Sequence, residues 1–142
     1  MPPPDRARLA RLQRLEKVRA IARQQAAAEA AEAEGTLAQL RALAERTGQM
    51  ASDYAARRDA ADGAALRGLA AFRDGLDGVS RGTRADAERA RGLADRKLRE
   101  LSEAERRRQA AETRASAEAR ALANAGQQAP LGARRKLGTE LE

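Results

Sequence analysis

Residues 37–54 have the sequence LAQLRALAERTGQMASDY, in which apolar or small side chains recur at alternating intervals of three and four residues. This spacing is the seam of a left-handed coiled coil, because it keeps one stripe of a helix facing a partner. The stripe comprises Leu37, Leu40, Ala44, Thr47, Ala51 and Tyr54. A second stripe comprises Leu69, Phe72, Leu76, Val79, Thr83, Ala87, Ala90 and Leu93. The two stripes predict two paired helices, with a slip of the seam after Leu93, since the next leucines are Leu98 and Leu101.

Composition favours helices over any sheet fold. Ala, Arg, Leu, Glu and Lys make up about two-thirds of the 142 residues, a share typical of coiled coils. Leu, Ile, Val and Phe together account for about one residue in seven, too few for the core of a globular domain of this length. No proline lies between Pro4 and Pro130, which favours long helices over disorder. A β-sandwich, a barrel and a Rossmann-type domain are excluded.

The predicted fold is therefore all-α, a long antiparallel two-helix coiled-coil hairpin over residues 1–124. Asp5 is a suitable N-cap for a first helix over residues 5–61. The dipeptide Asp62-Gly63 predicts the turn at residues 62–64, which leaves a second helix of similar length over residues 64–124. Gly126 and Pro130 are stop signals, so residues 125–142 are predicted to form a flexible tail.

Charge pairing supports the antiparallel arrangement. With the turn at Gly63, residue i faces residue 127 − i. This register places Arg8, Arg11 and Arg14 near Glu112 and Glu118, Arg19 and Arg23 near Glu103 and Glu105, the acidic residues of 29–34 near the cations of 96–99, and Tyr54 opposite Phe72. Each surface pair contributes at most about 1 kcal/mol, so the informative point is that all of them agree in one register.

The residue types exclude most chemistry. The chain has no Cys and no His, so thiolate catalysis, imidazole catalysis and zinc sites of those ligands are absent. We find no catalytic constellation, cofactor motif or metal-ligand set, and we expect a protein that is not an enzyme. The net charge of +7 is spread along the chain, and one Tyr and one Phe leave little to stack on bases, so specific nucleic-acid binding is not expected.

Two segments allow both a structural and a functional interpretation. Residues 6–23 carry seven cations between apolar residues and could pair within the hairpin, lie on an anionic membrane or enter a partner groove. The second segment contains Phe72, Leu76 and Val79. These side chains could pack together and hold the loop end of the hairpin closed, or they could form a docking patch for a partner. The glycines at 75 and 78 would let another backbone approach this patch closely.

The layout resembles the flagellar export protein FliJ and its type III secretion stalk relatives, over roughly residues 6–124. The resemblance rests on the arm Arg8-Leu-x-x-Leu-x-x-Leu-x-x-Val18, on Leu40, Leu43 and Tyr54, on the Gly-bearing turn, and on Phe72-x-x-x-Leu76-x-x-Val79. The chain departs from the family in its scarcity of aromatic residues. The pattern is similar to that of both flagellar and injectisome members, and does not separate the two.

The resemblance implies a cytoplasmic stalk, peripheral to the inner membrane, that couples a hexameric export ATPase to the membrane export gate. It implies that the ATPase contacts Arg8, Arg11, Arg14 and Arg120, and that the gate contacts Phe72, Leu76 and Val79. It also implies binding of export chaperones, at residues that it does not identify. Two other hypotheses remain open: a structural coiled coil of the stator or scaffold type, and a basic helical protein that coats nucleic acid or a membrane surface.

Overall fold

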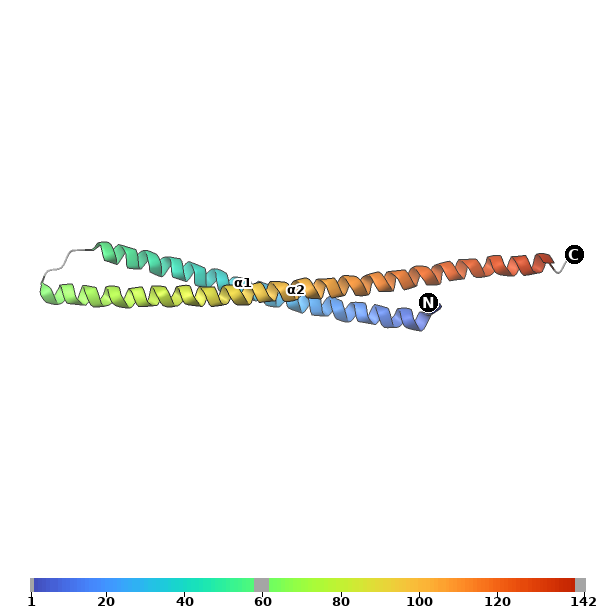
Figure 1. Cartoon of the computed structure of the whole chain (residues 1–142), viewed down its shortest axis with the longest axis horizontal. Coiled ribbons are helices and arrows are strands. Elements are labelled where there is room, and N and C mark those ends of the chain that lie inside the picture. Colours follow the sequence, from blue (N-terminus) through green and yellow to red (C-terminus); the bar gives the residue numbers. More distant parts are fainter. Residues whose placement is uncertain (1, 58–61, 140–142) are drawn as a thin grey trace. The chain divides into compact units, whose positions relative to one another are not determined.

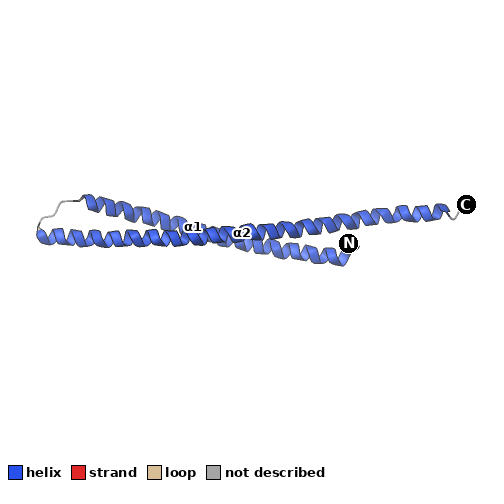
Figure 2. Ribbon diagram, viewed as in Figure 1, coloured by secondary structure: helices blue, strands red, loops and turns tan. Residues whose placement is uncertain are grey.

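The computed structural model consists of two long helices (Figures 1 and 2). It describes residues 2–57 and 62–139, and for residues 129–139 it describes the backbone alone. Helix α1 spans Arg6–Ala56 and helix α2 spans Gly63–Thr139, with no strand in these described ranges. The fold is the predicted all-α antiparallel helical hairpin.

The chain divides into two compact units, each made of one segment from each helix. The loop unit comprises residues 27–100 and the terminal unit comprises residues 1–26 and 101–142. Within each unit the two segments run antiparallel, as shown by the pairs Arg8–Glu118, Arg23–Glu105, Lys97–Glu29, Thr47–Thr83 and Tyr54–Phe72. The residue numbers of these pairs add up to between 126 and 130, which confirms the predicted register.

Both helices begin at an aspartate cap. The Ala7 N–H donates to Asp5 Oδ1 at 3.0 Å, and the Ala65 N–H donates to Asp62 Oδ1 at 2.7 Å. Each side chain thereby satisfies one of the free N–H groups of a first helical turn. Asp5 is the predicted cap, and α2 begins at Gly63, within one residue of its predicted start.

Helix α1 ends earlier than predicted, at Ala56 instead of residue 61. The Arg57 N–H donates to the Tyr54 carbonyl at 3.2 Å, a tightened final turn, and the Arg57 guanidinium lies 4.8 Å from the centre of the Tyr54 ring. The segment between α1 and α2 is therefore longer than the predicted three-residue turn; residues 58–61 lie outside the described part of the chain.

Helix α2 continues past its predicted end near Asn124, through Gly126 and Pro130, to Thr139. Glycine and proline inside a helix cost about 1 and 3 kcal/mol relative to alanine, a penalty that does not forbid helix. The neighbouring residues are mostly Ala, Gln, Leu, Arg and Lys, which favour it. The last part of the predicted tail, residues 140–142, lies outside the described residues.

The buried residues of both helices recur with heptad spacing. On α2, however, they follow a different stripe from the predicted one. In the loop unit the α2 residues that follow this spacing are Leu69, Arg73, Leu76, Ser80, Thr83, Ala87, Ala90, Ala94 and Lys97, and Asp86 and Gly92 beside them are also half-buried. Phe72, Val79 and Leu93 were predicted in the seam, yet their exposed fractions are 48%, 53% and 41%. The seam follows the small residues because they let the helices approach closely, and the predicted slip after Leu93 is absent.

The core of the loop unit is small and alanine-rich. Ala33, Leu37, Ala90 and Ala94 form a buried cluster, and Leu40 packs against it. Leu37 is 4% exposed and Ala94 is fully buried. In this cluster a large residue of α1 meets small residues of α2, which agrees with the predicted register, since residue 37 faces residue 90 in it.

Candidate partner-binding surfaces

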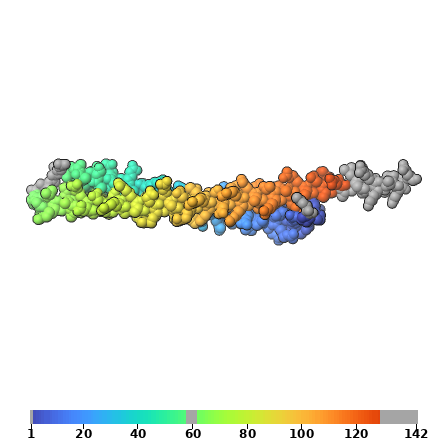
Figure 3. Space-filling view, viewed as in Figure 1, coloured from blue at the N-terminus to red at the C-terminus, as the bar shows by residue number. Residues whose placement is uncertain are grey.

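The structure divides the predicted gate patch between two environments. Leu76 is half-buried in the seam of the loop unit, which agrees with the structural interpretation of this residue. Phe72 and Val79 lie outside the seam and are exposed. Figure 3 shows the α2 segment of the loop unit, green to yellow, as a continuous exposed surface. The Phe72 ring packs edge-on against Tyr54 with centroids 4.7 Å apart, so it also closes the end of the hairpin.

A polar layer crosses the seam of the loop unit next to this patch. The hydroxyls of Thr47 and Thr83 lie 3.1 Å apart, and both residues are buried. Each hydroxyl also lies near a backbone carbonyl of its own helix, that of Ala44 at 3.1 Å and that of Ser80 at 3.0 Å. The two hydroxyl groups have two hydrogens for these three contacts. A shift of one helix along the other would separate the threonines and lose the contact between them, so the layer favours the observed register.

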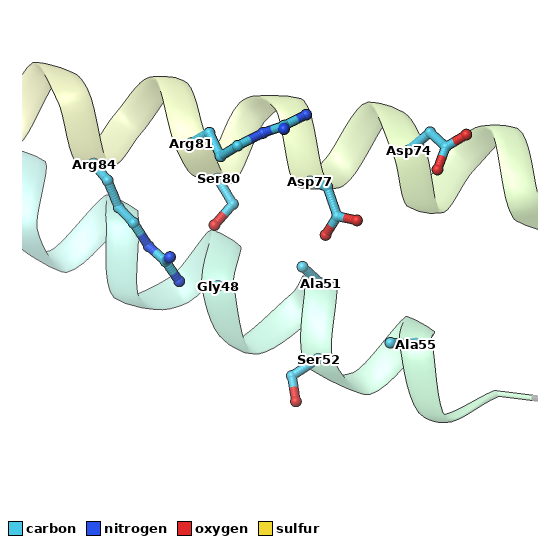
Figure 4. A pocket seen from close by; sticks show the side chains of 9 residues that line it. All are labelled: Gly48, Ala51, Ser52, Ala55, Asp74, Asp77, Ser80, Arg81 and Arg84. Atoms are coloured by element: carbon cyan, nitrogen blue, oxygen red, sulfur yellow. The ribbon is translucent and has the colours of Figure 1, made fainter.

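An open hollow lies between α1 and α2 of the loop unit, with a volume of about 650 Å³ (Figure 4). Small residues line it from α1, whereas α2 contributes Asp74, Asp77, Ser80, Arg81 and Arg84. A Cβ atom at Gly48 would come within 3.3 Å of Arg84 Nη2, so this glycine makes room for the guanidinium. In Figure 4, Ser80 and Asp77 point toward α1. The hollow mixes both charges, which is typical of a solvated groove.

The predicted ATPase-side arginines lie on more than one face of the terminal unit. Arg8 Nε is 3.9 Å from Glu118 Oε2, and its side chain is 44% exposed. Arg11 and Arg14 are exposed on the face of α1 opposite the seam and form no salt bridge with another described residue. Arg120 is exposed on α2, two residues beyond Glu118. Arg8, Arg11 and Arg14 follow one another at intervals of three residues along α1, and we call them the basic row; it turns from the seam at Arg8 to the outer face at Arg14, and Arg120 is separate from it.

The same outer face of α1 carries apolar side chains. Val18 and Ile21 are 60% and 58% exposed, although leucines 9 and 12 of the same three-residue spacing are half-buried. A spacing of three drifts around the helix, so the later residues leave the seam. The N-terminal arm therefore places apolar residues both in the seam and on an exposed face.

Charge pairing across the hairpin predicted Arg23 near Glu105 and Glu29 near Lys97, but it did not predict the contacts of Arg108 or that Arg108 and Lys97 are seam residues. Arg108 donates two hydrogen bonds to Glu105, at 2.8 and 3.0 Å, and one to Glu112 at 2.9 Å. Arg23 Nε approaches the same Glu105 carboxylate at 3.0 Å. The hydrogen bond from Arg108 is the main cause that lowers the pKa of Glu105, and Glu105 in turn raises the pKa of Arg108.

Lys97 occupies the corresponding place in the loop unit. Its ammonium lies 3.1 Å from Glu29 Oε2 on α1 and 3.3 Å from Glu100 Oε2 on α2. The hydrogen bond to Glu29 is the largest cause that raises the pKa of Lys97, followed by that to Glu100. Strict three-and-four spacing through positions 94, 97 and 101 would have identified Lys97 as a seam residue.

The described residues contain no group of three carboxylates that could hold a metal ion. Within the same residues, neither helix has a stretch apolar enough to cross a bilayer. Comparisons of the chain with protein-family models, with curated proteins and with solved structures gave no match.

Proposed function

We propose that this chain is the ATPase-associated stalk of a flagellar-type protein export apparatus. The observation that carries the proposal is that the antiparallel hairpin has two unlike exposed surfaces in different units. The terminal unit presents the basic row Arg8, Arg11 and Arg14, and the loop unit presents Phe72 and Val79. A protein that couples two different partners needs two such surfaces, and both stay partly exposed although Arg8 pairs with Glu118 and Phe72 packs against Tyr54.

In this proposal the basic row contacts loops of the hexameric export ATPase, with Arg120 as a separate contact from α2. Exposed cations steer association with an acidic partner, because their charge acts beyond contact distance. Phe72 and Val79 dock on the membrane export gate, and Leu76 supports them from the seam. The protein is then cytoplasmic, reaches the inner membrane through its partners, and does not itself catalyse a reaction. Export chaperones are further proposed partners.

The decisive experiment measures ATP hydrolysis and ring assembly of the cognate export ATPase with and without the chain. We expect stimulation at stoichiometric amounts, lost when Arg8, Arg11 and Arg14 are all changed to Gln. The matched control changes the exposed Arg41, Arg46 and Arg91 of the loop unit to Gln, which removes the same charge and should keep stimulation. If the wild-type chain has no effect at any salt concentration, the stalk proposal fails and a structural coiled coil is favoured.

The gate side is tested with two variants of one patch. Val79→Asp places a charge on an exposed position and should abolish binding to the gate protein while helicity stays at the wild-type level. Leu76→Asp places a charge in the seam and should lower the thermal midpoint as well. Gate binding that survives Val79→Asp would restrict Phe72 and Val79 to a structural role.

A second candidate function is binding to an anionic membrane surface, and one observation favours it. Val18 and Ile21 are exposed on the face of α1 that also carries Arg11 and Arg14. Such a face is typical of helices that lie in the headgroup region. Flotation with anionic vesicles, compared between wild type and Val18→Ser/Ile21→Ser, separates this function from the stalk proposal, because only membrane binding requires the two apolar residues.

A further inference from the structure

The most informative unpartnered surface is the outer face of α2 in the loop unit. Phe72 and Val79 border it with roughly half of each side chain exposed. The face itself has heptad spacing and consists of Gly68, Ala71, Gly75, Gly78, Gly82 and Ala85. Its opposite border is a row of exposed charges seven residues, or about two turns, apart: Arg67, Asp74, Arg81 and Glu88. An apolar border, a narrow small-residue seam and a charged border are the parts of a helix–helix interface.

The glycines of this face have no explanation within the hairpin. A Cβ atom built at Gly68, Gly75, Gly78 or Gly82 meets no atom within 4 Å. No glycine of the described residues has a positive φ, so the backbone conformation does not require glycine either. Each one lowers helix stability relative to alanine. The absence of side chains is useful only if another backbone approaches closely.

We propose that this face binds the same face of a second copy of the chain, antiparallel, about a twofold axis between Leu76 and Asp77. This interface between the two copies then places Gly75 opposite Gly78 of the second copy, Ala71 opposite Gly82, and Gly68 opposite Ala85. A twofold interface repeats every contact, so a favourable pair occurs twice. This inference does not depend on the proposed export function.

The charged border selects this register. In an antiparallel pair with this seam, Asp74 lies beside Arg81 of the second copy, and Arg67 lies beside Glu88. All four charges of the border are thus matched, each with its opposite. A shift of one heptad in one direction brings Asp74 beside itself and Arg67 beside Arg81. The opposite shift brings Arg81 beside itself and Asp74 beside Glu88, and like charges destabilise both alternatives.

The apolar border agrees with the same register. Phe72 lies beside Val79 of the second copy, and Val79 beside its Phe72, which covers the exposed part of both side chains. A parallel pair would instead place Arg67 beside Phe72 and Asp74 beside Val79, so charges would face apolar groups. The matching of both borders in one register identifies a second copy, rather than an unrelated helix, as the occupant.

The test is a charge exchange followed by sedimentation equilibrium over a range of concentrations. Asp74→Arg and Arg81→Asp each convert two attractive pairs into two repulsive ones, and each should weaken self-association by at least about tenfold. The double variant Asp74→Arg/Arg81→Asp restores opposite pairs and should return the dissociation constant to near the wild-type value. Glu45→Arg, an exposed position on α1, is the matched control and should leave self-association unchanged.

Direction is tested by cross-linking, since the chain has no cysteine of its own. The antiparallel register places Ala65 beside Asp86 of the second copy. A mixture of Ala65→Cys and Asp86→Cys chains should form a mixed disulfide, and neither variant alone should cross-link. The proposal is overturned if the wild-type chain stays monomeric up to about 0.5 mM, if Asp74→Arg leaves self-association intact, or if the double exchange fails to restore it.

Discussion

The loop unit and the terminal unit share one heptad spacing but fill their seams differently. In the loop unit the seam contains the buried cluster of Ala33, Leu37, Ala90 and Ala94. In the terminal unit two alanines of α2, at 111 and 115, are buried, and charged side chains such as Arg108 share the seam with them. The difference teaches that heptad spacing fixes which residues face the partner helix, whereas their chemistry decides whether apolar burial or ion pairing stabilises the unit.

The largest effect should come from removing the main apolar residue of the loop unit. Leu37→Ala leaves a cavity in a seam that has few other large side chains, and should lower the free energy of unfolding by about 2–4 kcal/mol. Urea denaturation followed by circular dichroism measures this loss. The control is Leu43→Ala, because Leu43 is 41% exposed and should cost well under half as much. Equal losses for the two variants would contradict the burial contrast.

A smaller gain is expected on the outer face of α2. Gly78→Ala should stabilise the monomeric chain by about 1 kcal/mol, because alanine favours helix and a Cβ there meets open space. Gly48→Ala is the matched comparison and should gain less, since its Cβ would crowd Arg84. Thermal unfolding at a concentration too low for self-association measures both. A larger gain at Gly48 than at Gly78 would refute the contrast.

The threonine layer should show a coupling of about 1 kcal/mol. Thr47→Val and Thr83→Val each remove one side of the buried hydroxyl contact, whereas the double variant removes both and should cost less than the two single changes added. A double-mutant cycle from urea unfolding gives the coupling. Thr36→Val, at an exposed position of α1, is the control for the change of side chain. Strict additivity would show that the layer adds no coupling across the seam.

The smallest effects should be changes of stability with pH. The terminal unit should lose stability in acid, and the loop unit should lose stability in alkali. The pKa of Glu105 is lowered, so its contribution to stability is present above the ordinary carboxyl range and lost as the pH falls through the lowered value. The pKa of Lys97 is raised, so its contribution is present below the ordinary lysine range and lost as the pH rises through the raised value. Hydrogen exchange, resolved by peptide, should detect acid loosening in residues 101–128 first and alkaline loosening in residues 27–100 first.

Matched variants connect these losses to the two groups. Glu105→Gln should flatten the acid response of the terminal unit, whereas Glu103→Gln should not, because Glu103 is 3.7 Å from Arg107 and both are largely exposed. Identical acid responses of these two variants would show that the Arg108 hydrogen bonds to Glu105 are immaterial.

Sequence reasoning found the two helices, their register and the Asp5 cap because these depend on local and repeating signals, whereas it identified Asp62 only as part of the turn. Asp5 and the pairing of Arg8 with Glu118 are examples. It placed Phe72 and Val79 in the seam because it chose the largest apolar residues, whereas the helices pack along smaller ones such as Ser80 and Ala94. Which of the two adjacent stripes of α2 forms the seam depends on how closely the backbones of α1 and α2 approach. That distance is a property of the packed pair and is not determined by the sequence of either helix alone.

The candidate surfaces were less predictable than the fold. Phe72 and Val79 belong to a surface only because the seam excludes them, so their exposure follows from tertiary packing. The proposed gate contact and the proposed self-association require the same two side chains. The two partners would therefore compete, and Asp74→Arg is expected to weaken one association without removing the apolar residues that the other needs.

Tyr54 gives the chain a built-in optical reporter. The protein has one Tyr and no Trp, so all of its absorption and emission near 280 nm originate at this single ring. The ring contacts both the guanidinium of Arg57 and the ring of Phe72, where the last turn of α1 meets α2. Its near-ultraviolet circular dichroism and fluorescence thus report, without any label, whether this end of the hairpin is closed. Because Phe72 also borders the proposed interface, the same signal would register the arrival of a partner.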